Sequence, residues 1–363
     1  MKHPIIEDCD IKEVNEVFRS GNLSLFRGTQ EGQDGGPKVQ ALEQAFRDYF
    51  KVKYAVSFNS ATAALHAACV ACGVGFAICT PFTFVASASC VLQANGRVFW
   101  CDIDKDTFCM DIKQNNLCNA HAIIPVHLMG HPAEMDQIMA FAARTRTKVI
   151  EDCAQAIGAE YHGKKVGTIG DCGIFSFNQW KTISTGEGGM LITNNDWINR
   201  VARALRNHSE VSDPELKIVG YNYRMTEYTA SLALSQFKRL DAMNEHRRAL
   251  CQYMSRHLDY GPFEPPIEQK DCKHVYYTYG LKYHGDDRDE YQQRLIDNGA
   301  FFGRGGYVRP LYHLPIFGID KELCPVAERM HQREIMVTDI FRPPMTFSDC
   351  DHILEVMKCQ LKK

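Results

Sequence analysis

Short apolar runs alternate with longer stretches of helical periodicity through the first two-thirds of the chain. The short runs are rich in β-branched, aromatic and small apolar residues and predict strands at Tyr54–Phe58, Ala77–Thr80, Arg97–Ile103, Ala122–His127, Lys148–Asp152, Cys172–Phe177 and Gly189–Asn194. Between them, the residue pattern predicts helices at Ala61–Cys72, Phe84–Ala94, Glu134–Arg144 and Trp197–Leu205. This alternation is typical of an α/β fold with a mostly parallel seven-stranded sheet sandwiched by helices. Only a short glycine-rich loop separates the last two strands, so at least one strand should run antiparallel.

A long helical pattern from Thr226 to about His257 leads out of this region, and the sequence changes in character beyond it. The segment Asp259–Lys270 contains proline and glycine and predicts a connector. The sequence KHVYYTYGLKY then predicts a strand, and Asp289–Asn298 and Asp349–Gln360 predict helices. We therefore expect a large α/β domain over residues 1–240 and a smaller α+β domain over residues 241–363.

The charge balance narrows the classes of partner. The 363 residues include 41 Lys and Arg against 44 Asp and Glu, so the net charge is only −3. This balance argues against a nucleic-acid binder with a broad basic face and gives no basic membrane anchor. No apolar run approaches the roughly 18–20 residues that span a bilayer, and MKHPIIEDCDIKEV lacks the apolar core of a signal peptide. We expect a cytoplasmic protein.

The 15 cysteines are scattered along the chain. The one close pair, Cys69 and Cys72, falls in the alanine-rich helical segment LHAACVACGVG, and no second CxxC follows at zinc-site spacing. We expect reduced, mostly buried thiols that act as small apolar side chains, and no metal site.

Three of the predicted strands end beside residues that could bind a ligand or take part in catalysis. The first lies in YAVSFNSATAALHAA, where the strand ends at Phe58 and Ser60-Ala61-Thr62 opens a helix. The start of a helix presents N–H groups and the positive end of its dipole, which suit a phosphate. Ser and Thr are also ordinary N-cap residues, so this segment alone leaves both interpretations open.

The second strand end lies in KVIEDCAQAIGA and carries Asp152, followed in the next turn by Gln155. An acid at this place is often a cap, but it also suits a protonated ring nitrogen. The third strand, FSF, is followed by Lys181 and then by GEGG, which lets the backbone pass close to a ligand. A lysine in a polar loop is commonly solvated, whereas a Schiff-base lysine must be held close to its aldehyde partner.

A phosphate cradle, an acid for a ring nitrogen and a lysine, on successive strand ends, together indicate pyridoxal 5'-phosphate (PLP). Open α/β sheets bind ligands at the carboxyl ends of their strands, so the three groups should meet there. Gln155 could then hydrogen-bond the phenolic oxygen of the cofactor ring.

The same segments resemble the DegT/DnrJ/EryC1/StrS family of PLP-dependent sugar aminotransferases, which have the fold type I of aspartate aminotransferase. The resemblance covers nearly the whole chain and includes SATAALHAA, PFTFVASA, PVHLMGHPAEMD, EDCAQAIGAEYHGKKVGTIGD, FSFNQWKTISTGEGGML and GYNYRMTEYTASLALSQ. The lysine segment and GYNYRMTE are long and specific motifs.

The resemblance implies roles for individual residues. Lys181 would form the Schiff base and move protons, Asp152 would pair with the ring nitrogen, and Gln155 would contact the phenolic oxygen. The phosphate would lie among Ala61, Thr62 and Ser176, with Asn222 reaching in from the partner of a homodimer, and Phe84 would stack on the ring. His127 and His208 fall in matching segments without an assigned role, and we expect both to be buried and hydrogen-bonded.

The implied reaction is a ping-pong transfer of an amino group, with glutamate as donor by family analogy, to a keto-sugar. Such reactions serve lipopolysaccharide or other cell-surface polysaccharides and secondary metabolites. Arg304, Arg309 and His313 in GRGGYVRPLYHLP are candidates for holding an anionic group, and a solvated basic turn is the alternative. The loop RGTQEGQDGG, which begins at Arg27, is longer than in many nucleotide-sugar members and lies near the substrate entrance, so Arg27 is a further candidate.

Several alternatives remain for the acceptor and the activity. The acceptor is either a nucleotide-linked sugar or sugar acid, or a free acceptor such as a keto-octulosonate or cyclitol. Sugar dehydratases related to this family carry histidine in place of the lysine, and Lys181 argues against that activity. A regulatory relative without catalysis would not need the lysine, the acid and the glycine-rich loop together.

Overall fold

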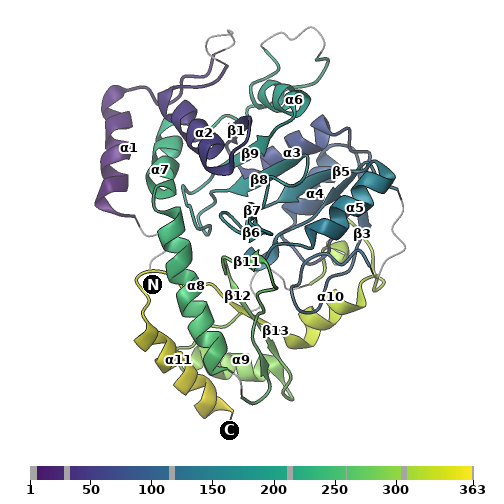
Figure 1. Cartoon of the computed structure of the whole chain (residues 1–363), viewed down its shortest axis with the longest axis vertical. Helices are drawn as coiled ribbons and strands as arrows, with labels where there is room; N and C mark the ends of the chain where they lie inside the picture. Colours follow the sequence, from purple (N-terminus) through teal and green to yellow (C-terminus); the bar gives the residue numbers. More distant parts are fainter. Residues whose placement is uncertain are drawn as a thin grey trace.

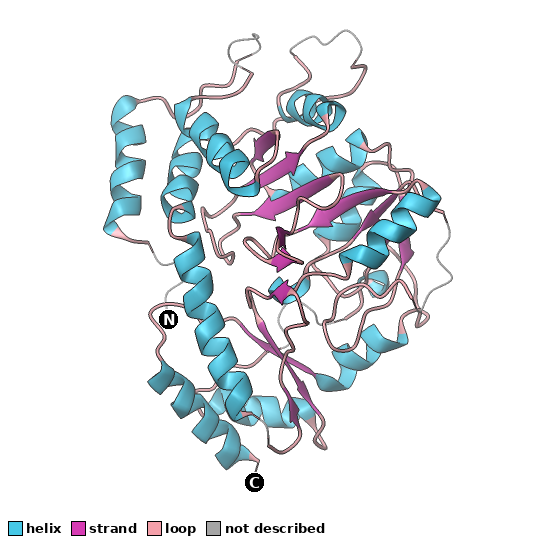
Figure 2. Cartoon of the chain, in the orientation of Figure 1, coloured by secondary structure: helices cyan, strands magenta, loops and turns pink. Residues whose placement is uncertain are grey.

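A mostly parallel seven-stranded sheet forms the centre of the larger part of the molecule (Figures 1 and 2). The computed structural model describes residues 6–27, 33–113, 119–210, 216–258, 260–303 and 309–361. The strands are β1 (Tyr54–Phe58), β2 (Phe76–Cys79), β3 (Arg97–Trp100), β4 (Ala122–Ile124), β5 (Lys148–Asp152), β8 (Cys172–Ser176) and β9 (Gly189–Thr193). Their order is β1-β9-β8-β5-β4-β2-β3. The predicted α/β fold and its seven strands are confirmed.

Strand β9 is antiparallel to both of its neighbours, β1 and β8, whereas the other four pairs of adjacent strands are parallel. The predicted antiparallel strand is therefore confirmed. Strands β2, β8 and β9 each end one residue earlier than predicted, and two strands end three residues earlier, β3 at Trp100 and β4 at Ile124. Beyond those points the chain makes only isolated bridges, between Ile103 and Met110 and between Val126 and Asp152, and turns toward the carboxyl edge of the sheet.

Helices cover both faces of this sheet (Figure 2). The predicted helices correspond to α3 (Ala61–Ala71), α4 (Ala86–Gln93), α5 (Met135–Thr145) and α6 (Asp196–Arg206). Two further helices, α1 (Asp8–Ser20) and α2 (Pro37–Phe50), precede the first strand and were not predicted. Helix α2 buries Val39, Leu42 and Phe46 at helical spacing, and the Glu227 carboxylate accepts N–H bonds at its start.

The long helix predicted from Thr226 to His257 is wrong in one respect: it is two helices, α7 (Glu227–Phe237) and α8 (Leu240–His257). The backbone leaves helical geometry at Arg239, with φ −108° and ψ 3°. The Arg239 guanidinium donates to Glu7 and Asp10 at the start of α1, at 2.8 and 3.0 Å. These two ion pairs hold Arg239 against α1, which lies along α7 (Figure 1).

The C-terminal part is built on a three-stranded antiparallel sheet of β10 (Phe263–Glu264), β12 (Tyr279–Tyr283) and β13 (Ile335–Thr338). Helices α9 (Arg288–Asp297) and α11 (Phe347–Gln360) correspond to the two predicted there, and α10 (Pro325–Arg329) runs into a π-helical turn, Met330–Glu334. The short strands β6 (Glu160–Tyr161), β7 (Lys164–Lys165) and β11 (Cys272–Lys273) form a third sheet that joins the two parts. Two short 3₁₀ helices cover Leu128–Gly130 and Leu311–His313.

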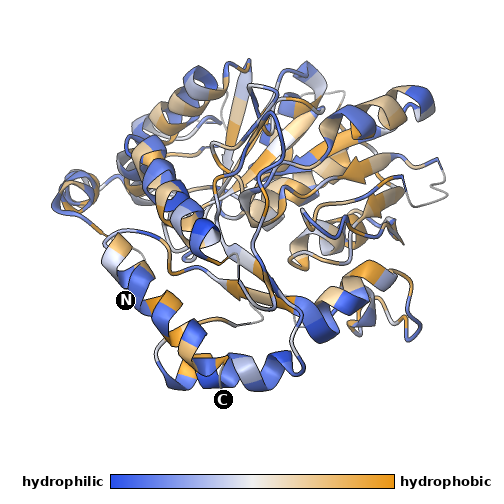
Figure 3. Ribbon diagram, turned by 60° about the horizontal axis from the view of Figure 1, so that its bottom comes forward, coloured by the Kyte–Doolittle hydropathy of each residue, from blue (hydrophilic) through white to orange (hydrophobic). Residues whose placement is uncertain are grey.

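Buried apolar side chains pack on the large sheet in two clusters. Many positions in its strands are hydrophobic (Figure 3). A separate buried cluster around Leu250, Tyr279 and Tyr291 supports the C-terminal sheet. The core of the large sheet also includes Tyr312 and Ile335, so the two parts share buried surface. The expected domain boundary at residue 240 stays a prediction.

Most of the described cysteines are buried, and those in the described part of the chain are free thiols. Within the same residues, no helix is long and apolar enough to cross a membrane.

Candidate active site

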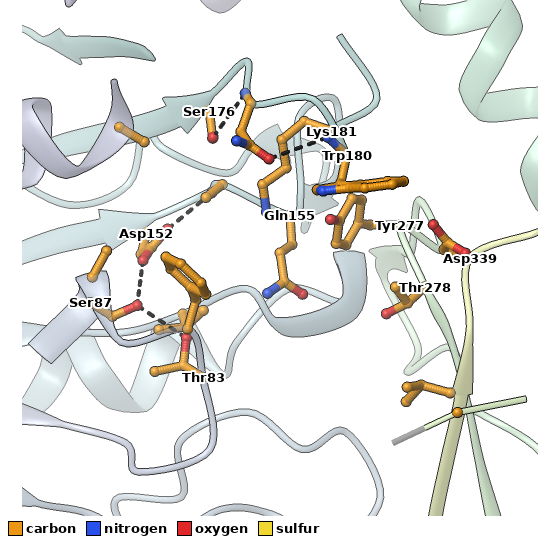
Figure 4. A pocket seen from close by; sticks show the side chains of 18 of the residues that line it. Thr83, Ser87, Asp152, Gln155, Ser176, Trp180, Lys181, Tyr277, Thr278 and Asp339 are labelled. Atoms are coloured by element: carbon orange, nitrogen blue, oxygen red, sulfur yellow. Dashed lines mark hydrogen bonds between the residues drawn. The ribbon is translucent and has the colours of Figure 1, made fainter. Parts of the chain in front are cut away.

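A cavity of about 890 Å³ opens at the carboxyl edge of the parallel strands, between the large sheet and the C-terminal sheet (Figure 4). Its walls come from the start of α3, the segment before α4, the ends of β5 and β8, and the segments around β12 and β13. Seven of the predicted site residues line it: Ala61, Thr62, Phe84, Asp152, Gln155, Ser176 and Lys181. Segments distant in sequence therefore meet in one place.

The start of helix α3 forms one wall. Ser60 Oγ accepts the N–H of Ala63 at 3.1 Å, whereas the N–H groups of Ala61 and Thr62 have no partner among the described residues. Gly189 allows the helix to approach the sheet, because a Cβ atom there would lie 2.5 Å from the Ala61 nitrogen. Gly189 also pairs with Ser176, which places this serine in the strand beside the helix start. Backbone N–H groups and a hydroxyl at a helix N-terminus can bind an anion.

The Asp152 carboxylate lies at the base of the cavity and is only 3% exposed. Its Oδ2 accepts a hydrogen bond of 2.7 Å from Ser87 Oγ, and its Oδ1 accepts the N–H of Ala154 at 3.0 Å. Ser87 Oγ is 3.0 Å from Thr83 Oγ1, so two hydroxyl groups support the carboxylate (Figure 4). Burial, followed by the nearby Asp152, raises the pKa of the Cys79 thiol and keeps that neighbour neutral. The hydrogen bonds from Ser87 and Ala154 therefore fix the orientation of the Asp152 carboxylate.

The orientation of the Gln155 side chain is fixed by the backbone. Its Oε1 accepts the N–H of Met129 at 2.8 Å, and Met129 has a positive φ of 55°. Gly130 follows, and a Cβ atom there would lie 2.8 Å from the nitrogen of Tyr277. The turn that holds Gln155 therefore also packs closely against the segment that brings Tyr277 to the cavity.

Lys181 follows β8 in a loop with many internal hydrogen bonds. Its backbone N–H donates to Asn178 O, and the N–H of Gln179 donates to Gly186 O, both at 2.8 Å. The Lys181 ammonium lies 4.5 Å from the centre of the Tyr277 ring, a cation–π distance. The loop thus holds the amine inside the cavity (Figure 4).

Arg247 of α8 supports this loop from behind. The arginine is 5% exposed, and its Nη1 donates to Thr182 Oγ1 at 2.9 Å. Burial lowers the pKa of the guanidinium. The hydroxyl is a neutral partner, so the buried charge of Arg247 contacts the residue that follows Lys181 and forms no ion pair with a carboxylate among the described residues.

Two large rings at the cavity are mostly exposed. Phe84 is 61% and Trp180 57% exposed, although both line the cavity. Trp180, Tyr277, Thr278 and Asp339 were not predicted as site residues. Trp180 had a sequence signal, since it directly precedes Lys181, whereas the other three come from the C-terminal part and had none.

The remaining predicted residues that fall in the described part of the chain do not line this cavity. Asn222 is exposed, and its carbonyl accepts from Asn59 Nδ2 at 3.2 Å. Arg27 and Arg309 are exposed. His313 bonds to Glu328 Oε1 at 2.8 Å and to the carbonyl of Ile319 at 2.9 Å. Arg304 lies outside the described residues.

The two histidines in matching segments differ. His127 is fully buried; its Nδ1 accepts the N–H of Ala133, so its Nε2 is the donor to Glu151, 3.0 Å away. The expectation that His208 is also buried is wrong, because this residue is exposed. Helix α6 ends at Arg206, and the chain turns outward at His208 with a positive φ of 60°.

Known proteins resemble this chain along almost its full length. The model of the DegT/DnrJ/EryC1/StrS aminotransferase family matches residues 5–358. A GDP-perosamine synthase from Escherichia coli O157:H7 is 32% identical over 83% of this chain and 84% of that protein. A UDP-4-amino-4,6-dideoxy-N-acetyl-beta-L-altrosamine transaminase from Campylobacter jejuni is 35% identical over 75% of this chain and 72% of that protein. A solved aminotransferase from Psychrobacter cryohalolentis superimposes with a TM-score of 0.89, at 27% identity, and covers 100% of this chain and 98% of that one.

Proposed function

The chain belongs to the DegT/DnrJ/EryC1/StrS aminotransferase family, and on this basis we propose that it uses PLP to transfer an amino group from glutamate to a nucleotide-linked keto-sugar. The observation that carries the proposal is the meeting of a helix start, the buried Asp152 and Lys181 in one cavity. Each group alone has a structural explanation. Together they match the three ends of PLP: a phosphate, a ring nitrogen and an aldehyde.

The residues present fit this cofactor. The phosphate would be held by the N–H groups of Ala61 and Thr62 and by the Ser176 hydroxyl, in the space that Gly189 keeps free of a Cβ atom. Asp152 would receive the N–H of the ring nitrogen, and Gln155 would lie beside the phenolic oxygen. Phe84 offers an exposed ring for stacking on the cofactor.

When bound, PLP supplies an electron sink that stabilises negative charge on the carbon next to the amino nitrogen. The carboxylate of Asp152 keeps the ring nitrogen protonated, and Ser87 holds that carboxylate in place. Through its Nζ, Lys181 would take a proton from the donor's α-carbon and deliver one to the carbon on the other side of the shared nitrogen, the former aldehyde carbon of the cofactor. The same amine performs the reverse proton transfers for the acceptor, which gives a ping-pong reaction.

Two relatives support a nucleotide-linked sugar as the acceptor. The two named above are described as a GDP-perosamine synthase and as the transaminase of a UDP-linked amino sugar. A nucleotide-linked sugar with a ring ketone is therefore the first acceptor to test. A free keto-sugar, a keto-octulosonate and a cyclitol ketone are the alternatives.

The test is a screen of these ketones in which glutamate labelled with ¹⁵N is the amino donor and the aminated product is detected by mass spectrometry. We expect ¹⁵N in a nucleotide-linked amino sugar and none with the Lys181→Ala variant. Release of water without amination would indicate a dehydratase instead. If the purified chain, loaded with PLP, aminated only acceptors without a nucleotide, the proposed acceptor class would be wrong.

We propose further that the enzyme is a homodimer with shared active sites. Asn222 lies exposed and outside the cavity of its own subunit, as a residue that serves a neighbouring subunit would. An amide N–H from the partner's Asn222 would add a charge-assisted hydrogen bond to the phosphate.

A further inference from the structure

The cavity has two regions of different chemistry. Around Ser60, Asp152 and Ser176 it is lined by polar groups, which the proposed cofactor would use. Beyond Lys181 the lining is dominated by large side chains: Trp180, Tyr277, Ile296, Phe301, Phe302 and Ile340. Phe301 is 59% exposed and Trp180 57%. Large apolar side chains that stay exposed at the mouth of a cavity commonly mark the surface that a ligand covers.

The backbone at Trp180 is anchored beside the reacting lysine. Trp180 directly precedes Lys181, and its backbone N–H donates to Asn178 Oδ1 at 3.3 Å. Ser184, at the far side of the same loop, donates its hydroxyl to Gln179 O at 2.8 Å and is paired through its backbone with Gln236 of α7. A ring on an anchored loop loses little conformational entropy when a ligand packs against it.

The charges near Trp180 favour a neutral part of the ligand that carries hydroxyl groups. Among the described lining residues the acids are Asp152, Glu187 and Asp339, and Lys181 is the sole cation. Asp339 Oδ2 accepts from Arg342 at 3.1 Å, which orients the carboxylate, and its Oδ1 has no partner in the described part of the chain. A carboxylate oxygen repels anionic groups but accepts hydrogen bonds from hydroxyl groups.

A pyranose ring combines the two properties that this region complements. One face carries C–H groups that can pack on an aromatic ring, and its edge carries O–H donors. We propose that Trp180 determines acceptor specificity: its indole packs against the C–H face of the sugar ring of the acceptor, while Asp339 accepts a hydrogen bond from a sugar hydroxyl. This inference rests on the proposed function and adds the residues that recognise the sugar.

The experiment measures binding without turnover. UDP-N-acetylglucosamine and GDP-mannose carry no ketone, so they can be titrated into the PLP-loaded enzyme and compared with UDP and GDP. The ratio of the Kd of the nucleotide to the Kd of its sugar conjugate isolates the contribution of the sugar. In the wild type we expect at least one pair to give a ratio of roughly three- to tenfold, and the sugar conjugate to quench the indole fluorescence that Trp180→Phe removes.

The variants distinguish a sugar contact from a structural role. Trp180→Ala should bring the ratio close to one, and Asp339→Asn should lower it. Trp197→Ala is the matched control, because Trp197 is 46% exposed on α6 and does not line the cavity, and it should keep the wild-type ratio. The rate of the glutamate half-reaction can be measured from the absorbance of the cofactor. Trp180→Ala should lower this rate by a smaller factor than it lowers the Kd ratio.

Several results would overturn the inference: a wild-type ratio near one, no binding of any of the four probes, a ratio that survives Trp180→Ala, or equal loss of the glutamate half-reaction. A ratio near one together with tight binding of UDP or GDP would mean that the indole stacks on the base. Because no turnover is needed, failure here is separate from failure of the amination screen.

Discussion

Ser87 illustrates how a single hydroxyl group can control the proposed chemistry. Its Oγ donates at 2.7 Å to Asp152, the carboxylate that would face the cofactor nitrogen. A hydrogen bond to a charged group contributes about 1.5–3 kcal/mol, so we expect Ser87→Ala to lower kcat by roughly ten- to a hundredfold. Asp152→Ala should lose more, while keeping some PLP through the phosphate contacts.

Ser89→Ala is the control for this series, since Ser89 lies on the same helix and does not line the cavity. Steady-state rates with glutamate and the acceptor found in the screen provide the measurement. Near-normal turnover of Asp152→Ala would show that another group stabilises the ring nitrogen.

Glu43 links helix α2 to helix α6 through ion pairs with two arginines. It accepts from Arg206 at 2.7 Å and from Arg203 at 3.0 Å. Burial favours a raised pKa, but the two arginines outweigh it and hold the pKa of Glu43 below its ordinary value. A carboxyl group with a lowered folded-state pKa stabilises the protein above its unfolded pKa, and this stabilisation is lost as the pH falls through the folded value.

We therefore expect Glu43→Gln to lower the free energy of unfolding by about 3–5 kcal/mol at pH 7, because the buried charge of Arg206 would lose its carboxylate partner. The difference from wild type in urea-unfolding midpoint should shrink as the pH falls below about 4.3, the unfolded value for glutamate. Glu16→Gln, at an exposed ion pair with Lys38, should change the midpoint little. A difference that grows toward low pH would contradict this account.

The sequence identifies some site residues and misses others for a physical reason. Asp152 and Lys181 follow strand ends, and neighbouring parallel strands bring such ends to one edge. Ser87 lies inside a helix, and Tyr277 lies in a segment with a strand-like pattern, so their local sequence gives no sign of the cavity. Their positions depend on how distant segments pack, as in the close contact between Gly130 and Tyr277.

At the scale of elements, the approach of helix α3 to strand β9 builds the anion site. A Cβ atom at Gly189 would lie 2.5 Å from the backbone of both Ser60 and Ala61. We expect Gly189→Ala to push the helix start away and to weaken PLP binding by at least about tenfold, because charge-assisted bonds to a phosphate depend on short distances. Equilibrium dialysis of PLP against the apoenzyme measures the change.

Gly75→Ala is a suitable control for the same sheet, because the nearest atom to its Cβ would be a His121 ring carbon at 3.5 Å, an ordinary contact. This variant should bind PLP like the wild type. If Gly189→Ala also bound PLP normally, the start of α3 would not be the phosphate site.

The boundaries of helices and strands, like the site residues, are predicted well where local sequence determines them and poorly where distant contacts do. The strands β1 and β5 begin and end where the sequence predicted, since their apolar runs are fully paired within the sheet. The continuous helical pattern from Thr226 onward hides the break at Arg239, whose side chain forms ion pairs at the start of α1, more than 200 residues away in sequence. Periodicity reports which face is buried and is silent about such distant contacts.

At the scale of the whole molecule, the shared-site dimer predicts complementation between two inactive variants. Lys181→Ala subunits would lack the amine, and Asn222→Glu subunits would present a negative charge to the partner's phosphate site. After subunit exchange, each mixed dimer should contain one site with both defects and one with neither. Activity should therefore return to a fraction of the wild-type value, measured after mixing the separately purified variants.

Exchange itself is verified by native mass spectrometry of differently tagged subunits. A fully active monomer, or proven exchange without any recovery of activity, would show that each subunit contains a complete site.

The most direct test of the account is to locate the covalent attachment of the cofactor. The PLP-loaded enzyme is reduced with borohydride, digested and mapped by peptide mass spectrometry. The account predicts a phosphopyridoxyl group on Lys181 alone, loss of the visible absorbance on reduction, and no adduct in Lys181→Ala although that variant remains folded. An adduct on a different lysine, or a protein that binds no PLP at all, would contradict it.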